Sequence, residues 1–376
     1  MTARGEASLI IAASEADANL YYATRFLAPD PFIFLQVAGE KVLLLSDLEI
    51  DRGRQQQAAV QTIIPLSRYE DEARRAGEGT GLAATAARLL RERGVSAVQV
   101  PANFPLGLAD DLRACGVMVR AKPDPFYEAR TVKTAEEVAA ISHALAATEG
   151  AMDVAIGALR AAKVHEGVLT LEGEVLTSER VKRMIAAHLL ERDYLAQHTI
   201  VAGGEQGCDP HEEGHGPLRA DTAIIIDIFP RSIATRYHGD LTRTVVKGQV
   251  SATLRSQYAA VRAAQEEALA AIRAGVEGPE VHARVSSLFE AQGYRTGEVA
   301  GRMQGFFHGT GHGLGLEIHE PPRISKVPAT LQAGNVVTVE PGLYYPGVGG
   351  VRLEDVVVVT EAGCTNLVKY PKILEV

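Results

Sequence analysis

The first 125 residues alternate short apolar runs with helical sequence. The apolar runs have the length and the β-branched content of strands, and they span residues 8–13, 32–37, 41–45, 97–101 and 116–119. A helical pattern lies near residues 80–93. Ala38, Gly39 and Glu40 separate two of the runs and suit a hairpin. This alternation predicts a small α/β domain over residues 1–125.

Two prolines, Pro123 and Pro125, then interrupt the pattern and mark a domain boundary. Shortly afterwards Thr134 and Glu137 stand at the spacing of a capping box, in which the two side chains satisfy free amide donors at the start of a helix. Apolar residues recur from there at helical spacing. We therefore expect a second domain over residues 126–376.

Within this second domain the order helix, helix, strands occurs twice. The first set has predicted helices at about 135–162 and 174–192, then strand-rich sequence at 198–246. The second set has predicted helices at about 252–274 and 278–292, then strand-rich sequence at 335–359. Pro279 lies in the first turn of the last helix, where a proline is well tolerated. The repeat predicts an α+β domain made of two related halves that face one another, although their sequences do not visibly match.

Composition narrows the class of protein. The chain has 376 residues, which is enough for two domains, and a net charge of -9, which argues against a broad nucleic-acid-binding surface. Cys115, Cys208 and Cys364 lack CxxC spacing, so we expect free thiols in a reducing compartment. The apolar run from Leu9 to Ala13 is too short for the core of a signal peptide or for a membrane span. These features predict a cytoplasmic protein that binds neither nucleic acid nor a membrane.

Each half of the second domain carries two acids in apolar, strand-like sequence. Asp227 ends the run that starts at Ala223, and Asp240 precedes another such run 13 residues later. Glu340 and Glu354 repeat the arrangement in the second half. Four carboxylates that converge in a core repel one another. A pair of divalent cations removes that repulsion, because carboxylates bridge two metals and such pairs activate water.

A glycine-rich segment from His308 to Glu320 offers an imidazole as the fifth ligand. It contains His308, His312 and His319, and its glycines let the backbone approach a ligand closely. The glycine spacing is not that of a dinucleotide site, so no dinucleotide-binding residues are predicted. Four carboxylates and one imidazole suit Mn²⁺, Co²⁺, Fe²⁺ or Zn²⁺.

Together these motifs resemble the pita-bread metallopeptidases, and within them the branch of prolidase and aminopeptidase P. The matching strings run in order along the chain: Ile226-Asp227, Gly239-Asp240-Leu241-Thr242-Arg243-Thr244, His308-Gly309-Thr310-Gly311-His312, His319-Glu320, Glu340-Pro341-Gly342-Leu343-Tyr344 and Arg352-Leu353-Glu354-Asp355. Residues 1–130 resemble the creatinase-like amino-terminal domain of that branch. The resemblance implies a pita-bread catalytic domain, two bound metals and a homodimer.

The resemblance also assigns roles to individual residues. Asp227 would bind one metal, Asp240 and Glu354 would bridge both, and His312 and Glu340 would bind the other. His308 and His319 match family histidines that bind substrate and stabilise the oxyanion, and Arg352 matches an arginine beside the last ligand.

Two features depart from the family pattern. The two aspartates of the family are usually 11 residues apart, with a shorter turn between them, whereas Asp227 and Asp240 are separated by 13. We expect a longer hairpin tip that keeps metal binding and leaves room for an altered substrate entrance. A family histidine that precedes the first aspartate by about 17 residues is best matched by His211, with His215 as the rival.

The implied activity is hydrolysis of the bond between an N-terminal residue and a following proline in small peptides, with Glu340 as the general acid and base. The first choice is an Xaa-Pro dipeptidase (prolidase) that uses two divalent metals, with Mn²⁺ preferred. The nearest alternative is an aminopeptidase P that acts on longer peptides. A methionine aminopeptidase normally lacks the first domain, while a metal-free creatinase-like enzyme or a non-catalytic binding protein would have substituted ligands.

Overall fold

The computed structural model describes residues 7–56, 59–77 and 79–376. The chain divides into two compact units, Met1–Glu128 and Ala129–Val376. This division falls three residues beyond the predicted boundary.

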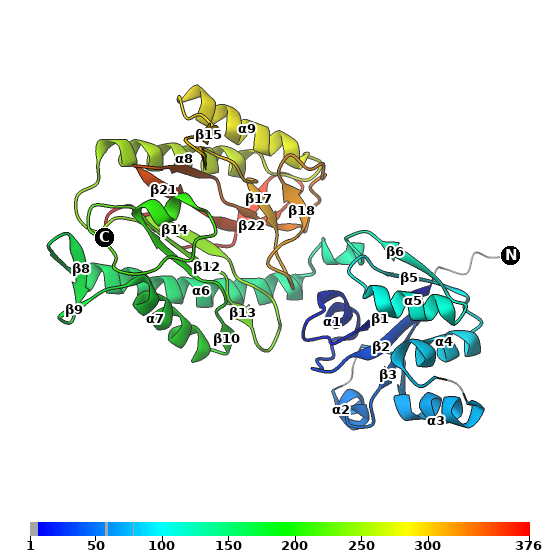
Figure 1. Cartoon of the computed structure of the whole chain (residues 1–376). Coiled ribbons are helices and arrows are strands. Elements are labelled where there is room, and N and C mark those ends of the chain that lie inside the picture. The colour runs from blue at the N-terminus through cyan, green and yellow to red at the C-terminus, as the bar shows by residue number, and fades with distance from the viewer. Residues whose placement is uncertain (1–6, 57–58, 78) are drawn as a thin grey trace. The chain divides into compact units, whose positions relative to one another are not determined.

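The first unit is built on a six-stranded sheet in the order β4-β3-β2-β1-β5-β6 (Figure 1). Its strands are β1 (Ala7–Ala12), β2 (Phe32–Val37), β3 (Glu40–Leu45), β4 (Thr62–Pro65), β5 (Ala97–Pro101) and β6 (Met118–Lys122). Its helices are α1 (Ala18–Thr24), α2 (Ile50–Gln55), α3 (Leu66–Ala76), α4 (Leu82–Glu92) and α5 (Leu106–Ala114). Apolar clusters cover both faces of the sheet, which explains why β2 is apolar along most of its length.

The sequence pattern located the strands of this unit better than its helices. The predicted hairpin is present between β2 and β3, where Ala38 and Gly39 both have positive φ. The strand predicted at residues 116–119 is shifted, because Gly116 forms the left-handed turn after α5 and β6 begins at Met118. Helices α1, α2, α3 and α5 were not predicted, since they are short and lack a long apolar period.

The second unit contains two helix pairs and two groups of strands. Its helices are α6 (Ala135–Ala161), α7 (Ser178–Leu190), α8 (Ala252–Ala271) and α9 (Gly278–Ala291). Thr134 and Glu137 form the predicted capping box at the start of α6, and proline lies in the first turn of α9. In Figure 1 the strands lie between α6 and α8. This order of helix, helix and strands, repeated twice, confirms the predicted α+β class.

The strands that carry the acids belong to two sheets, one in each half. The first sheet has the order β11-β12-β14, with β11 (Ile200–Gly203), β12 (Ile224–Ile228) and β14 (Leu241–Val245). The second has the order β18-β17-β19-β22-β23, with β17 (Gly311–Gly313), β18 (Glu320–Ile324), β19 (Val336–Val339), β22 (Asp355–Val359) and β23 (Cys364–Asn366). A separate hairpin joins β20 (Gly342–Tyr345) to β21 (Gly349–Arg352).

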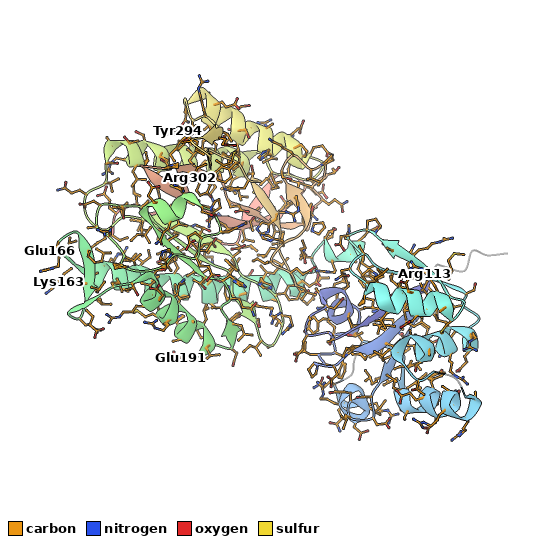
Figure 2. All side chains as sticks on the ribbon, in the orientation of Figure 1. Arg113, Lys163, Glu166, Glu191, Tyr294 and Arg302 are labelled. Atoms are coloured by element: carbon orange, nitrogen blue, oxygen red, sulfur yellow. The ribbon has the colours of Figure 1, made fainter. Side chains whose placement is uncertain are left out.

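Three small sheets lie outside the two main sheets of the unit. These are β7-β8-β9, β10-β13 and β15-β16, with β7 (Lys163–His165), β8 (Val168–Leu171), β9 (Glu174–Val175), β10 (Tyr194–Leu195), β13 (Arg231–Ser232), β15 (Gly297–Val299) and β16 (Arg302–Gln304). Exposed charged side chains such as Lys163, Glu166 and Glu191 project outward from the unit (Figure 2). Among the helices of the described residues, none is long and apolar enough to cross a membrane.

The long connection between Asp227 and Asp240 folds as an ordered turn of its own. Ser232 N–H donates to Tyr237 O at 3.0 Å, and Gly239 N–H donates to Pro230 O at 3.0 Å. The strand β13 within it also pairs with β10. The extra residues are therefore held at the tip, while β12 and β14 keep their antiparallel register.

The two halves meet where β14 runs beside residues 352–354. Glu354 N–H donates to Thr242 O at 3.1 Å, and Arg352 N–H donates to Thr244 Oγ1 at 3.0 Å. Thr244 Oγ1 in turn donates to Arg352 O at 2.9 Å. These hydrogen bonds fix the distance between the acids of the first half and those of the second.

Candidate metal centre

In the first half, two adjacent antiparallel strands supply Asp227 and Asp240. Asp227 lies within β12 and pairs with Thr242 of β14, and Asp240 directly precedes β14. Both residues are buried. The short antiparallel pairing brings their carboxylates to the same end of the sheet, as the sequence pattern predicted.

In the second half, Glu340 follows β19 directly and Glu354 lies between β21 and β22. His312 is the central residue of β17, whose neighbour Gly313 pairs with Val337 of β19. Glycine is required beside it, because a Cβ on Gly311 would lie 1.9 Å from Thr338 O. The glycine-rich sequence therefore lets β17 approach β19 closely enough for His312 to reach the acids.

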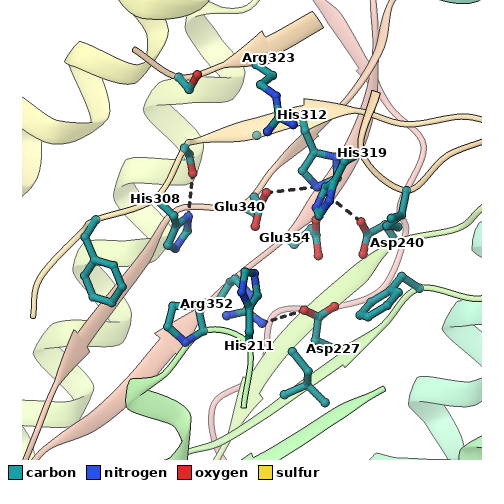
Figure 3. A pocket seen from close by; sticks show the side chains of 18 of the residues that line it. His211, Asp227, Asp240, His308, His312, His319, Arg323, Glu340, Arg352 and Glu354 are labelled. Atoms are coloured by element: carbon teal, nitrogen blue, oxygen red, sulfur yellow. Dashed lines mark hydrogen bonds and ion pairs between the residues drawn. The ribbon is translucent and has the colours of Figure 1, made fainter. Parts of the chain in front are cut away.

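The five predicted ligands face one shared space (Figure 3). Ligand atoms of Asp240, His312 and Glu354 all lie within 4.8 Å of one another. His312 Nε2 is 3.3 Å from Glu340 Oε1 and 3.8 Å from Asp240 Oδ2. Asp227 faces the same space from the opposite side.

Burial and mutual repulsion make these acids hard to ionise without a cation. Burial raises the pKa of Asp240 well above its usual value, and the Glu354 and Asp227 carboxylates raise it further. Burial likewise raises the pKa of Glu354, with Glu340 and Asp227 adding to the effect. The pKa of Glu340 rises to about 7, chiefly through burial.

His312 is arranged as a neutral ligand. Its Nδ1 lies 3.2 Å from Gly313 O, and because a carbonyl only accepts, Nδ1 carries the proton. The lone pair of Nε2 therefore points towards Asp240 and Glu340. Burial, with His319 nearby, lowers the pKa of His312 to about 3, so the ring stays neutral.

These residues fit a pair of divalent cations. Asp227 Oδ1 is buried and has no hydrogen-bond partner among the described residues, which leaves this acceptor available to a metal. The other oxygen, Oδ2, is held at 2.7 Å by Arg352 Nη2, and Glu354 Oε2 accepts a hydrogen bond of 2.7 Å from Thr242 Oγ1. Carboxylate ligands anchored in this way by neighbouring donors are typical of metal sites.

The cluster forms the base of a pocket of about 530 Å³. All the predicted site residues line this pocket: Asp227, Asp240, His312, Glu340, Glu354, His308, His319, His211 and Arg352. His215 is not among its lining residues, since it is exposed and its Nδ1 lies 3.2 Å from Glu212 Oε1. The structure therefore places His211 at the pocket, while His215 lies outside its lining.

Arg352, Tyr344 and His308 form a hydrogen-bonded chain along one wall. Arg352 Nη1 donates to the Tyr344 hydroxyl at 3.0 Å, and that hydroxyl lies 2.8 Å from His308 Nε2. His308 Nδ1 donates to Gly309 O at 2.8 Å, so Nε2 is the acceptor of the Tyr344 hydroxyl proton. Both ring nitrogens are thus engaged, and His308 presents its ring to the pocket as a wall rather than a free donor.

His319 lies beside His312, with ring centroids 4.3 Å apart and nearly perpendicular planes. The segment that carries it is anchored by the buried Glu320, whose Oε2 accepts from Arg130 Nη2 at 2.8 Å. Lys133 also pairs with Glu320. Because these cations lie just before α6, the start of that helix fixes the position of the His319 segment.

Some pocket residues were missed by sequence reasoning. Arg323, on β18, pairs through its backbone with His312 and lines the pocket, four residues after His319. Phe229 and Phe307 provide apolar surface. Tyr344 and Thr242 lie within motifs that were recognised, but their hydrogen bonds depend on tertiary contacts that a sequence does not display.

Comparisons with known proteins agree with this geometry. Residues 139–361, more than half of the chain, match the model of metallopeptidase family M24. The chain belongs to this family. An Xaa-Pro dipeptidase of Pyrococcus furiosus is 34% identical over 248 residues, covering 65% of this chain and 65% of that protein. An Xaa-Pro dipeptidase of Pyrococcus horikoshii is 26% identical over 358 residues, covering 93% and 90%.

Solved structures confirm the predicted fold. The structure described as Xaa-Pro dipeptidase from Bacillus anthracis superimposes with a TM-score of 0.83 at 22% identity, covering 99% of this chain and 95% of that one. At this identity the likeness concerns the fold, which is the pita-bread fold of the family. The M24 family membership establishes the protein as a metallopeptidase.

Proposed function

We propose that this M24 peptidase is an Xaa-Pro dipeptidase that binds two divalent metals through Asp227, Asp240, His312, Glu340 and Glu354. The observation that carries the proposal is the convergence of these five side chains at the base of one pocket. The two Pyrococcus relatives named as Xaa-Pro dipeptidases support the choice of substrate.

A divalent metal pair supplies Lewis-acid polarisation of the scissile carbonyl and lowers the pKa of water towards neutrality. The chain itself provides the proton transfer. Glu340, whose pKa rises to about 7, takes a proton from the attacking water and returns it to the proline nitrogen as the bond breaks. Like any peptide nitrogen, this one leaves as an amine only after it gains a proton, and in an Xaa-Pro bond it carries no hydrogen of its own.

The other pocket residues bind and orient the substrate. His319, beside His312, faces the position of the developing oxyanion. Phe307 and the His308 ring form a wall against which a proline ring can pack. Arg352 holds Asp227 in place and, through Tyr344, fixes His308. His211 reaches the pocket from the opposite loop.

Mn²⁺ is the proposed metal, because four of the five ligands are hard carboxylates and only one is an imidazole, a borderline ligand. A homodimer and a cytoplasmic location remain predictions, the first from the family resemblance and the second from composition. The three cysteines are free in the structure, as expected of a reducing compartment.

The test compares hydrolysis of a Gly-Pro dipeptide with that of an Xaa-Pro-Xaa tripeptide, in the presence of Mn²⁺ and with or without chelator. Preferred, chelator-sensitive cleavage of the dipeptide is expected. Asp240→Asn should abolish it, whereas Glu298→Gln, an exposed acid on β15, should not. Preference for the tripeptide would instead identify an aminopeptidase P. Metal binding without cleavage of either peptide would refute the proposed substrate.

A further inference from the structure

Arg243 is a fully buried residue on β14 whose guanidinium uses all its donors. Only 1% of its surface is exposed. Its Nη1 donates to Thr242 O at 2.9 Å and to Glu354 O at 2.6 Å. Its Nη2 donates to Asp355 Oδ1 at 2.9 Å and to Tyr370 O at 2.7 Å, and Nε donates to Pro371 O at 3.1 Å. Five N–H groups therefore meet five acceptors, the full capacity of an arginine.

These acceptors belong to three segments that are distant in sequence. Thr242 belongs to the strand that follows Asp240, Glu354 belongs to the second half, and Tyr370 and Pro371 belong to a segment near the end of the chain. Asp355 is held by two further donors, Lys372 Nζ at 2.7 Å and Asn366 Nδ2 at 2.8 Å. Arg243 thus joins both halves of the metal centre to residues 366–372.

Two neighbouring residues of β14, Thr242 and Arg243, both donate hydrogen bonds to Glu354. Thr242 and Arg243 are neighbours on a strand, so their side chains leave it in opposite directions. Thr242 Oγ1 holds the Glu354 carboxylate, while Arg243 holds the Glu354 backbone carbonyl. The carbonyl contact fixes where the backbone of Glu354 lies relative to Asp240, and the Thr242 contact fixes the direction of the carboxylate.

We propose that Arg243 is a positioning residue for the metal centre, which sets the separation of Glu354 and Asp240 and couples residues 366–372 to metal binding. The inference rests on the proposed metal site. A lysine cannot replace it, because its donors radiate from one nitrogen and cannot reach five acceptors in two directions.

The first experiment compares Arg243→Lys with Arg180→Lys. Both variants keep the positive charge and remove a guanidinium that holds backbone and carboxylate acceptors, but Arg180 donates to Leu171 O and Glu172 Oε2, which belong neither to the metal centre nor to residues 366–372. Metal-free protein is titrated with Mn²⁺ by calorimetry, and thermal unfolding is followed in parallel. We expect Arg243→Lys to weaken Mn²⁺ affinity by roughly 10- to 100-fold, the usual effect of losing a group that orients a ligand. Arg180→Lys should keep the wild-type affinity even where it lowers the unfolding temperature.

Equal Mn²⁺ affinities in the two variants would show that Arg243 is merely structural and overturn the inference. Failure of the unmodified protein to bind Mn²⁺ would instead refute the proposed metal site itself. Should Arg243→Lys not fold, hydrogen exchange of the unmodified protein decides. Mn²⁺ is expected to slow exchange in residues 366–372 and to leave α9 unchanged. Exchange in residues 366–372 that is indifferent to Mn²⁺ would contradict the coupling.

Discussion

The helices behind the two halves of the site hold the acid-bearing strands by different means. Helix α8 uses hydrogen bonds from a buried glutamine. Gln265 Nε2 donates to Val339 O at 2.8 Å and to Leu353 O at 3.1 Å. These are the carbonyls directly before Glu340 and Glu354, so one amide group holds the backbone at both glutamates.

Helix α6 holds the first half by close steric contact. A Cβ on Gly239, the residue before Asp240, would lie 2.4 Å from Thr148 Oγ1 and 2.8 Å from the Ala144 backbone. The backbone before Asp240 therefore rests directly on α6, against the Thr148 hydroxyl and the Ala144 carbonyl. Thr148 is itself fixed, because its hydroxyl donates to Ala144 O at 2.8 Å.

One problem therefore has two physical solutions in this domain. In both halves an acid must be kept in place against the repulsion of its neighbours. A hydrogen-bonded contact loses a limited amount of free energy when one donor is removed. A close contact between two backbones leaves no room for an added atom, so it should respond more sharply to a change of volume.

The largest effect is expected from Gly239→Ala. The added Cβ must displace the backbone before Asp240 from α6, which should lower the free energy of unfolding by about 3 kcal/mol, the upper range for overpacking. The same shift moves Asp240 and should greatly weaken Mn²⁺ binding, as measured by calorimetry.

Gly157→Ala is the matched control for this variant, because Gly157 lies on α6, the helix that Gly239 contacts. A Cβ there meets no atom within 4 Å, and the alanine should raise stability by roughly 0.5–1 kcal/mol through the unfolded chain. Unchanged stability and Mn²⁺ affinity in Gly239→Ala would show that the contact with α6 is not restrictive.

A smaller effect is expected from Gln265→Met. The substitution keeps the volume but leaves Val339 O and Leu353 O without this donor, which should lower the free energy of unfolding by about 2 kcal/mol. Because both carbonyls adjoin proposed ligands, Mn²⁺ affinity should also fall.

Gln257→Met provides the control on the same helix. Gln257 Nε2 makes two equivalent hydrogen bonds, to Leu343 O at 2.8 Å and Gly349 O at 3.0 Å, and neither acceptor adjoins a proposed ligand. It should lose similar stability and keep its Mn²⁺ affinity. Equal losses of affinity in the two glutamine variants would mean that α8 acts on the site only through overall stability.

The fold class and the set of candidate site residues could be predicted from the sequence, because each depends on local patterns. The capping box at Thr134 marks the start of a helix in four residues, and the strand-end acids are visible within each apolar run. The contacts of Gly239 and Arg243 were not predictable, since each depends on which distant segment packs against it. Gln257, Val261 and Gln265 recur every four residues on one face of α8, a pattern that could have indicated burial of the glutamines.

The smallest predicted effect concerns histidines on the outer helices of the two halves. On α9, His282 is buried and its Nδ1 lies 3.0 Å from Thr310 Oγ1. On α7, His188 has a buried Nε2 with no hydrogen-bond partner among the described residues. Burial lowers the pKa of both rings, with Lys326 contributing at His282 and Arg192 at His188. The fold therefore favours the neutral form of each.

Acid should accordingly weaken the metal-free protein through His282. Below about pH 6.5 the unfolded chain takes up a proton that the folded histidine resists, so the free energy of unfolding falls as pH falls. The slope from one group is at most about 1.4 kcal/mol per pH unit.

Thermal unfolding between pH 7.5 and 5.5 should show less acid sensitivity in His282→Gln than in the unmodified protein. The substitution of His282 also removes its contact with Thr310, so His282→Gln should be less stable than the unmodified protein at pH 7.5. His188→Gln should lose little stability at that pH. If His282→Gln were as sensitive to acid as the unmodified protein, His282 would not contribute to acid sensitivity. The two halves would then differ only in how α6 and α8 hold the acid-bearing strands.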